Sequence, residues 1–207
     1  HAFGYLYSES VNGNKLRWNN SGSIKLYVDT SDQNSPNINS TDVKTAVSEA
    51  ISDWNTSSPV KINPVYDSAM PALGTSASFR FSNNPAFFGN GVLAVTSISY
   101  NNSDGSIYSA DILMNESYSS SANFTANKSQ SSGSYAYIGD VITHEIGHLL
   151  GLNHSEVQKS SMIFSIFKGQ YSIHSDDVKG IAFEKFLGKT FRGELGQFFT
   201  PRTVVDY

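Results

Sequence analysis

The sequence predicts an α+β fold, and three observations lead to this prediction. Segments with the two-residue alternation of strands gather in the first 115 residues, one segment with helical spacing interrupts them, and two helical segments follow. No internal repeat divides the chain. With 207 residues, of which 39% are hydrophobic, the chain is long enough for one compact core.

The first half contains the expected strands. The first strand covers 23–31, where Ile24, Leu26 and Val28 would share one face. A helix follows over 39–55, with Ser40 or Thr41 as its N-cap. Its apolar side chains recur at helical spacing: Val43, Val47, Ala50, Ile51 and Trp54. Further strands are expected over 59–65, 77–82, 92–100 and 107–115, with a hairpin turn between the last two.

The second half is expected to be a loop and two helices. Residues 117–134 are mostly Ser, Asn, Thr and Gly, which indicates a flexible loop. A helix over 135–150 would end at Gly151, which can adopt the left-handed conformation of a helix C-terminus. A last helix over 174–188 would have Ser175 as its N-cap and two acids in its first turn.

Composition excludes several classes of protein. Net charge is −4 and no basic run stands out, so we expect no nucleic-acid partner. The absence of cysteine excludes disulfides, thiolate zinc sites and cysteine nucleophiles. No apolar run approaches the ~20 residues that span a bilayer. The chain begins at His1 rather than Met and lacks the features of a signal peptide, so we expect a secreted or extracellular protein whose signal has been removed. We also expect it to be a monomer.

The stretch HEIGHLLGLNH, residues 144–154, is the strongest functional signal. His144 and His148 are four residues apart on one helix, so both can bind the same metal ion, and a turn at Gly151 would bring back His154. Three imidazoles leave an open coordination position, which is typical of catalytic zinc. Glu145 would lie beside that position. Structural histidines, or a zinc site without a reaction, are the alternatives.

The residues after this motif resemble those of one family. Met162, in SSMIFS, comes eight residues after His154, as in the methionine turn of the metzincin metallopeptidases. Ser155 after the third histidine, and IHSDDVKGI over 173–181, are similar to the matrixins among them. RWNNSGSIKLYV, AISDW and GVLAVTSISY are weaker matches, and the resemblance covers about residues 15–187.

The resemblance implies a metzincin zinc-protease fold. Its twisted, mixed sheet would have five strands, mostly parallel, with one antiparallel edge strand. The fold would also contain an active-site helix and a C-terminal helix. The catalytic domain would cover 1–190, with the subdomain boundary near residue 154, and the tail 191–207 has no assigned role. The acids Asp176 and Asp177 resemble those that hold the methionine turn, although their place in a helix's first turn explains them as well.

The resemblance also implies a substrate cleft. The segment from Gly91 to Val95 would be the edge that pairs with an extended peptide, through Gly91, Val92, Leu93 and Ala94. Met162 would form a floor beneath the zinc ligands. Phe164, Ser165, Ile166 and Phe167 would form the wall of the pocket for the residue after the cleaved bond. Asp140 is either a surface carboxylate or a residue near the pocket entrance that favours polar or basic side chains.

For metals, we expect one catalytic zinc ion. Val95 replaces a histidine that binds a second, structural zinc in vertebrate matrixins, and no histidine occurs between His1 and His144, so we expect no second zinc. The acids Asp104, Asp111 and Glu116 leave calcium open, although we do not expect it. Phe164 lies where astacins have a metal-binding tyrosine, and a phenyl ring cannot bind zinc.

These observations predict a secreted zinc-dependent endopeptidase. A zinc-bound water would attack the peptide bond of an extended peptide or protein, with Glu145 as general base. The rival is a protein of the same fold that binds peptides but is catalytically silent or latent.

Overall fold

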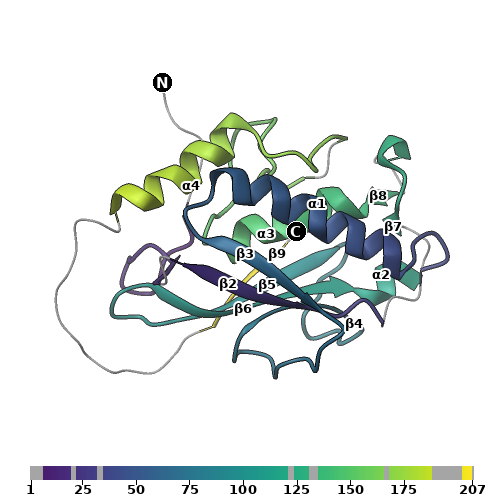
Figure 1. Ribbon diagram of the computed structural model, residues 1–207, viewed down its shortest axis with the longest axis horizontal. Coiled ribbons are helices and arrows are strands. Elements are labelled where there is room, and N and C mark those ends of the chain that lie inside the picture. Colours follow the sequence, from purple (N-terminus) through teal and green to yellow (C-terminus); the bar gives the residue numbers. More distant parts are fainter. Residues whose placement is uncertain are drawn as a thin grey trace.

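The computed structural model describes residues 7–19, 22–31, 35–120, 124–130, 135–165, 168–187 and 202–206. One mixed sheet organises it (Figure 1). The strand order is β3 (Lys61–Tyr66), β2 (Ser23–Val28), β4 (Ala77–Ser82), β6 (Ser106–Asn115), β5 (Ala94–Tyr100) and β9 (Arg202–Asp206). A short strand β1 (Arg17–Trp18) also pairs with β6.

The five expected strands lie side by side, and the sheet is mostly parallel as expected. Strands β2, β3, β4 and β6 are parallel, and β5 runs antiparallel to β6 through a hairpin. The count of five is too low, because β1 and β9 bring the described sheet to seven strands. Strand β5 is also not the edge, since β9 pairs with its outer side over Val95–Ser99.

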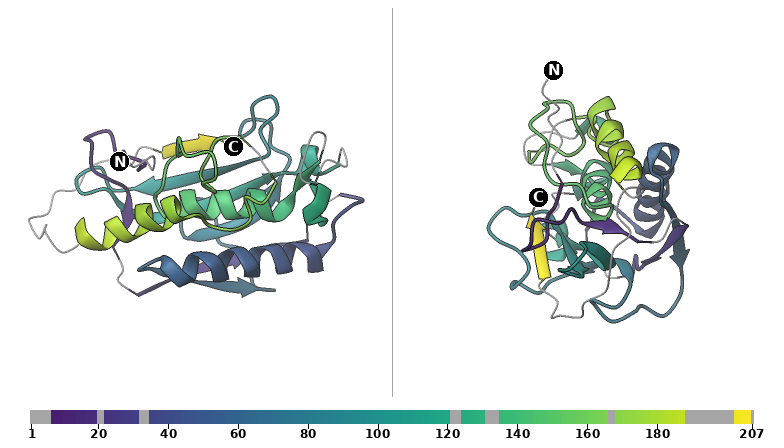
Figure 2. Two further views of the ribbon diagram at one scale, coloured as in Figure 1. Left: turned by 90° about the horizontal axis from the view of Figure 1, so that it is seen from above. Right: turned by 90° about the vertical axis from the view of Figure 1, so that its left-hand side faces the viewer.

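Two helices, α1 (Ser40–Ser57) and α3 (Ile138–Leu149), cover the same face of the sheet (Figures 1 and 2). A third helix, α4 (Ser175–Leu187), lies next to them. Between helices and sheet is the hydrophobic core, in which Trp54, Phe79 and Ile112 are fully buried. Trp54 of α1 also donates its indole N–H to the carbonyl oxygen of Thr143 (2.8 Å), which fixes α1 against α3.

The helix starts differ from the expected ones by one to three residues. Helix α3 begins at Ile138 rather than at residue 135, because Ala136–Tyr137 form a short strand before it. Asn39, rather than Ser40 or Thr41, caps α1, because its amide oxygen accepts the N–H groups of Thr41 and Asp42. In α4 the first helical hydrogen bond runs from the N–H of Val178 to the carbonyl oxygen of His174, so Ser175 is already inside the helix.

The expected flexible loop over 117–134 is wrong for the part that the structure describes. This part contains α2 (Glu116–Ser120), β7 (Phe124–Thr125) and η1 (Lys128–Gln130), and β7 pairs with β8 (Ala136–Tyr137). Phe124 is fully buried and packs on Tyr118 with 5.2 Å between ring centroids. One aromatic side chain therefore anchors the polar segment to the core. Residues 121–123 and 131–134 lie outside the described ones.

Within the described chain, none of the helices combines the length and apolarity needed to cross a membrane.

Candidate metal centre

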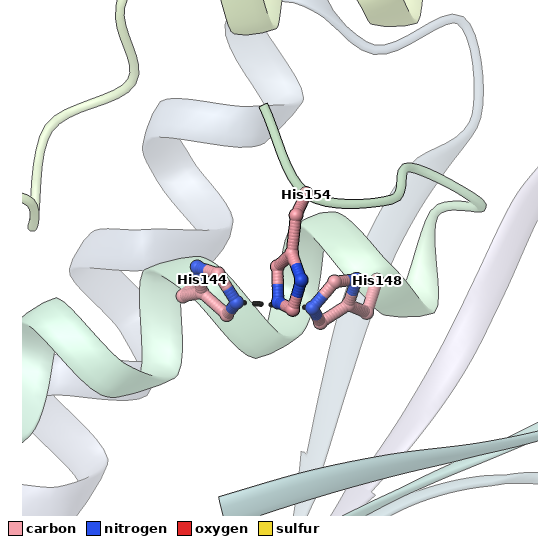
Figure 3. Close-up of side chains that lie close together, drawn as sticks. All are labelled: His144, His148 and His154. Carbon is pink, nitrogen blue, oxygen red and sulfur yellow. Dashed lines mark hydrogen bonds between the residues drawn. The ribbon is translucent and has the colours of Figure 1, made fainter. Parts of the chain in front are cut away.

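The three histidines of the motif converge on one point (Figure 3). His144 and His148 lie one turn apart on α3, and both are fully buried. The chain leaves α3 through Gly151, whose φ of 102° lies in the left-handed region, and returns His154 to the other two. One ring nitrogen from each lies within 4.8 Å of the others. No other such cluster occurs among the residues that the structure describes.

Backbone carbonyl groups fix the orientation of two rings. The Nδ1 atom of His144 lies 2.7 Å from the carbonyl oxygen of Ser161, and that of His148 lies 2.8 Å from the carbonyl oxygen of Leu152. Because a carbonyl oxygen can only accept, both Nδ1 atoms carry hydrogen. In the neutral rings, both Nε2 atoms then present a lone pair to the centre of the cluster.

This arrangement fits a zinc ion. The Nε2 atoms of His144 and His148 lie 3.0 Å apart, the contact drawn as a dashed line in Figure 3. Two lone pairs at this distance repel each other unless a cation lies between them. Two tetrahedral zinc ligands at ~2.0–2.1 Å from the ion are roughly 3.3 Å apart, so a small adjustment admits zinc.

Burial favours the neutral rings that a metal needs. It lowers the pKa of His144 well below its usual range, the charge of His148 lowers it further, and the Ser161 carbonyl acts in the opposite direction. Burial and the charge of His154 lower the pKa of His148 from 6.5 to about 3. Both rings are therefore unprotonated at neutral pH, as metal ligands must be.

Glu145 follows His144 on α3 and is fully buried. Its carboxylate points toward β5, where the hydroxyl of Thr96 donates to Oε2 over 2.5 Å. The same hydroxyl lies 3.2 Å from the backbone carbonyl oxygen of Glu145. The carboxylate is thus placed between the histidine helix and the strand that is expected to adjoin the substrate.

Met162 packs against α3 at Gly147. It is buried, and a methyl group added at Gly147 would lie only 2.1 Å from its sulfur atom. Gly147 stands between His144 and His148, so Met162 contacts the turn of helix that carries both rings.

The start of α4 holds the methionine turn. Asp177 accepts hydrogen bonds from the hydroxyl of Ser160 and from the N–H of Ser161 (2.9 Å). Asp176 accepts the hydroxyl of Ser155 (2.7 Å). Since the carbonyl of Ser161 contacts His144, these aspartates connect α4 to the histidine cluster.

The expected substrate segment lies at the start of β5. The carbonyl oxygen of Leu93 accepts the N–H of Asn115 in β6 (2.9 Å), so the backbone N–H and C=O groups of Leu93 point toward β6. Because the direction of these groups alternates along a strand, those of Ala94 point away from β6, to the outer side of β5. The pairing with β9 begins only at Val95. Gly91 has a φ of 81° and Val92 is half-buried.

The residues expected around the pocket for the residue after the cleaved bond differ in their exposure to solvent. Asp140 is fully buried, so the surface alternative is wrong; its carboxylate accepts the N–H of Tyr171 (2.7 Å). Phe164 is 70% exposed and Ser165 is also exposed. Ile166 and Phe167 lie outside the described residues.

Two of the acids considered as calcium ligands accept hydrogen bonds from nearby protein groups. Asp111 is fully buried and accepts the hydroxyl of Ser78 (2.5 Å) and the N–H of Gly74 (2.7 Å). Asp104 accepts the hydroxyl of Ser106 (2.6 Å). The expectations of no calcium and no second zinc stay predictions.

Three residues of the site were not predicted from the sequence. The carbonyl groups of Ser161 and Leu152 orient His144 and His148, and no side-chain pattern indicates backbone contacts of this kind. Thr96 contacts Glu145 from 49 positions earlier in the chain. Its signal was a polar residue between Ala94 and Ile98 on an otherwise apolar face of a predicted strand.

The fold is consistent with that of the metzincins, and its three clustered histidines could hold one metal ion. Comparison with known proteins gives the family. The family model of the matrixins matches residues 17–183. The chain therefore belongs to the matrixin family, which comprises zinc metalloendopeptidases. A relative, Metalloendoproteinase 2-MMP of Arabidopsis thaliana, is 44% identical over 55 residues, which are 26% of this chain and 15% of that protein.

Proposed function

We propose that this protein is a zinc-dependent endopeptidase with His144, His148 and His154 as metal ligands and Glu145 as general base. The main support for the proposal is that the Nε2 atoms of His144 and His148 lie 3.0 Å apart, while each ring is held by a hydrogen bond from its Nδ1 atom to a backbone carbonyl oxygen. The buried carboxylate next to them supports a reaction in addition to metal binding.

The chain's own residues would divide the work of hydrolysis. Zinc, when bound, would polarise the scissile carbonyl and make a water molecule more acidic. Glu145 would accept the proton of the attacking water at its carboxylate and deliver it to the leaving nitrogen. Ser161 and Leu152 keep two imidazoles in the ligand tautomer through their carbonyl oxygens.

Substrate would bind as an extended peptide beside the start of β5. The outward backbone groups of Ala94 support strand addition over Gly91, Val92, Leu93 and Ala94. Phe164 and Ser165, with Ile166 and Phe167, would border the pocket for the residue after the cleaved bond. Asp140 would lie near the entrance of this pocket and favour polar or basic side chains. Secretion remains a prediction from the sequence.

The test compares wild type with Glu145→Gln on a mixed peptide library, with zinc measured on both. We expect about one zinc per chain in each, and a kcat/KM at least about 100-fold lower in Glu145→Gln. Glu49→Gln is the control, because Glu49 forms a surface ion pair with Lys128 and should not affect turnover. Removal of zinc by 1,10-phenanthroline should abolish cleavage.

One observation favours the latent alternative. Strand β9 occupies the outer side of β5 directly beyond the expected substrate segment. Zinc in both variants with cleavage by neither would identify a latent or silent peptide-binding protein. A wild type that binds no zinc would contradict both functions.

A further inference from the structure

One polar residue interrupts the apolar face that β5 presents to α3. Ala94, Thr96 and Ile98 share this face, because strand side chains alternate, and all three are fully buried. Ala94 and Ile98 belong to the hydrophobic core. The hydroxyl of Thr96 therefore lies in an apolar interior, where a polar group requires a hydrogen-bond partner.

That partner is the carboxylate of Glu145. The Oγ1 atom of Thr96 lies 2.5 Å from Oε2 of Glu145 and 3.2 Å from its backbone carbonyl oxygen. A hydroxyl has one hydrogen to donate, and bonds to a charged acceptor are the shorter and stronger ones. The short distance identifies the carboxylate as the acceptor.

Both ends of this hydrogen bond belong to rigid elements. Thr96 is β-branched, with restricted side-chain rotation, and its strand position is set by pairing with Ile112 of β6. Helix α3 is fixed by two indole N–H groups, from Trp54 to the carbonyl of Thr143 (2.8 Å) and from Trp18 to that of Leu149 (2.7 Å). A glutamate has three rotatable side-chain bonds, so a fixed donor at its end reduces its freedom strongly.

We propose that Thr96 is the positioning residue of the general base: its hydroxyl holds the Glu145 carboxylate in the rotamer from which the carboxylate takes the proton of the attacking water. This inference rests on the proposed function. Misplacement of a reacting group by about 1 Å can cost two orders of magnitude in rate. Fixing the carboxylate therefore acts on turnover rather than on substrate binding.

The test uses Thr96→Val, which removes the hydroxyl but keeps the branched shape, and Thr96→Ser, which keeps the hydroxyl. We expect kcat about 10-fold lower in Thr96→Val, as for the loss of a hydrogen bond to a charged group, with little change in KM. Thr96→Ser should stay within about threefold of wild type. In a Glu145→Gln background, Thr96→Val should have no further effect, because the two residues act as a unit. Zinc content should be equal in all variants.

A spectroscopic measurement separates this inference from the proposed function. The ¹³C resonance of the Glu145 carboxyl group, assigned by its loss in Glu145→Gln, should shift in Thr96→Val but not in Thr96→Ser at one fixed pH. If wild type cleaves no peptide, the proposed function fails, and the resonance then tests only whether Thr96 holds the Glu145 carboxylate. An unchanged resonance, a kcat within twofold of wild type in Thr96→Val, or an equal loss in both variants would overturn the inference. Thr96→Ala replaces Thr96→Val should the latter not fold.

Discussion

Gly147 shows how a single residue can decide the geometry of this site. It lies between His144 and His148, and the sulfur of Met162 occupies the space that a side chain would need. A methyl group there would also lie 2.9 Å from the ring of Trp54. The close approach of helix, methionine and indole therefore requires glycine at this position.

Gly147→Ala is expected to destabilise the fold. Both neighbours are buried in a packed core, so they cannot move away without strain, and we expect a loss of about 1–3 kcal/mol in the free energy of unfolding. Urea denaturation of the metal-free chain measures it. Gly22→Ala is the matched control, because a methyl group there meets no atom within 4 Å, and it should change stability by less than about 0.5 kcal/mol. Equal stability of the two variants would contradict this account of the packing.

At the scale of elements, the site is assembled by α4 as well as by α3. Asp177 in the first turn of α4 accepts the hydroxyl of Ser160 and the N–H groups of Ser161 and His174. The carbonyl of Ser161 in turn contacts Nδ1 of His144. A helix that begins some thirty residues after the first histidine thus controls the orientation of that histidine.

Asp177→Asn should therefore weaken zinc binding although Asp177 is no ligand. An amide cannot accept all three hydrogen bonds as strongly as a carboxylate, so the methionine turn and the His144 ring lose their fixed position. We expect zinc affinity to fall by about 10–100-fold, measured by competition with a chelating dye. Asp67→Asn, which removes an exposed ion pair with Lys44, is the control. Unchanged affinity in Asp177→Asn would mean that the turn holds its shape without α4.

At the scale of the whole molecule, the sheet brings the C-terminal end of the described chain next to the strand that contacts Glu145. Strand β9 from the C-terminal end pairs with β5, whose Thr96 contacts the Glu145 carboxylate. In the register of this pairing, Val205 lies opposite Thr96. Strand β9 therefore lies along one part of the outer side of β5, and the expected peptide would lie along the part that precedes it.

Deletion of residues 188–207 should expose the outer side of β5. The backbone amides within Val95–Ser99 that bond to β9 would then face water, and we expect their hydrogen exchange to accelerate by about tenfold or more. Amides of β4 serve as the internal control, because β2 and β6 flank that strand on both sides. Unchanged exchange over Val95–Ser99 would show that β9 does not protect this side in solution.

Local sequence patterns were sufficient to predict most of the helices and strands. The alternation of Ile24, Leu26 and Val28 predicted a strand with one buried face, which the structure confirms. The glycine-ended helix with its histidines was also predicted, because the signal for both lies within about one turn of the residues concerned. Phe124 could not be placed in this way, since only contact with Tyr118 and the core shows that it anchors a polar segment.

The sequence by itself determined the order of the elements, the family resemblance and the three histidines that can share a metal ion, because periodicity and spacing are local properties of a chain. Only the tertiary structure decided that Ser161 orients His144, that Thr96 meets Glu145 and that β9 covers β5. These contacts join residues between 17 and about 110 positions apart, and such pairs come together through packing of the whole sheet and its helices, for which a single sequence carries no local signal.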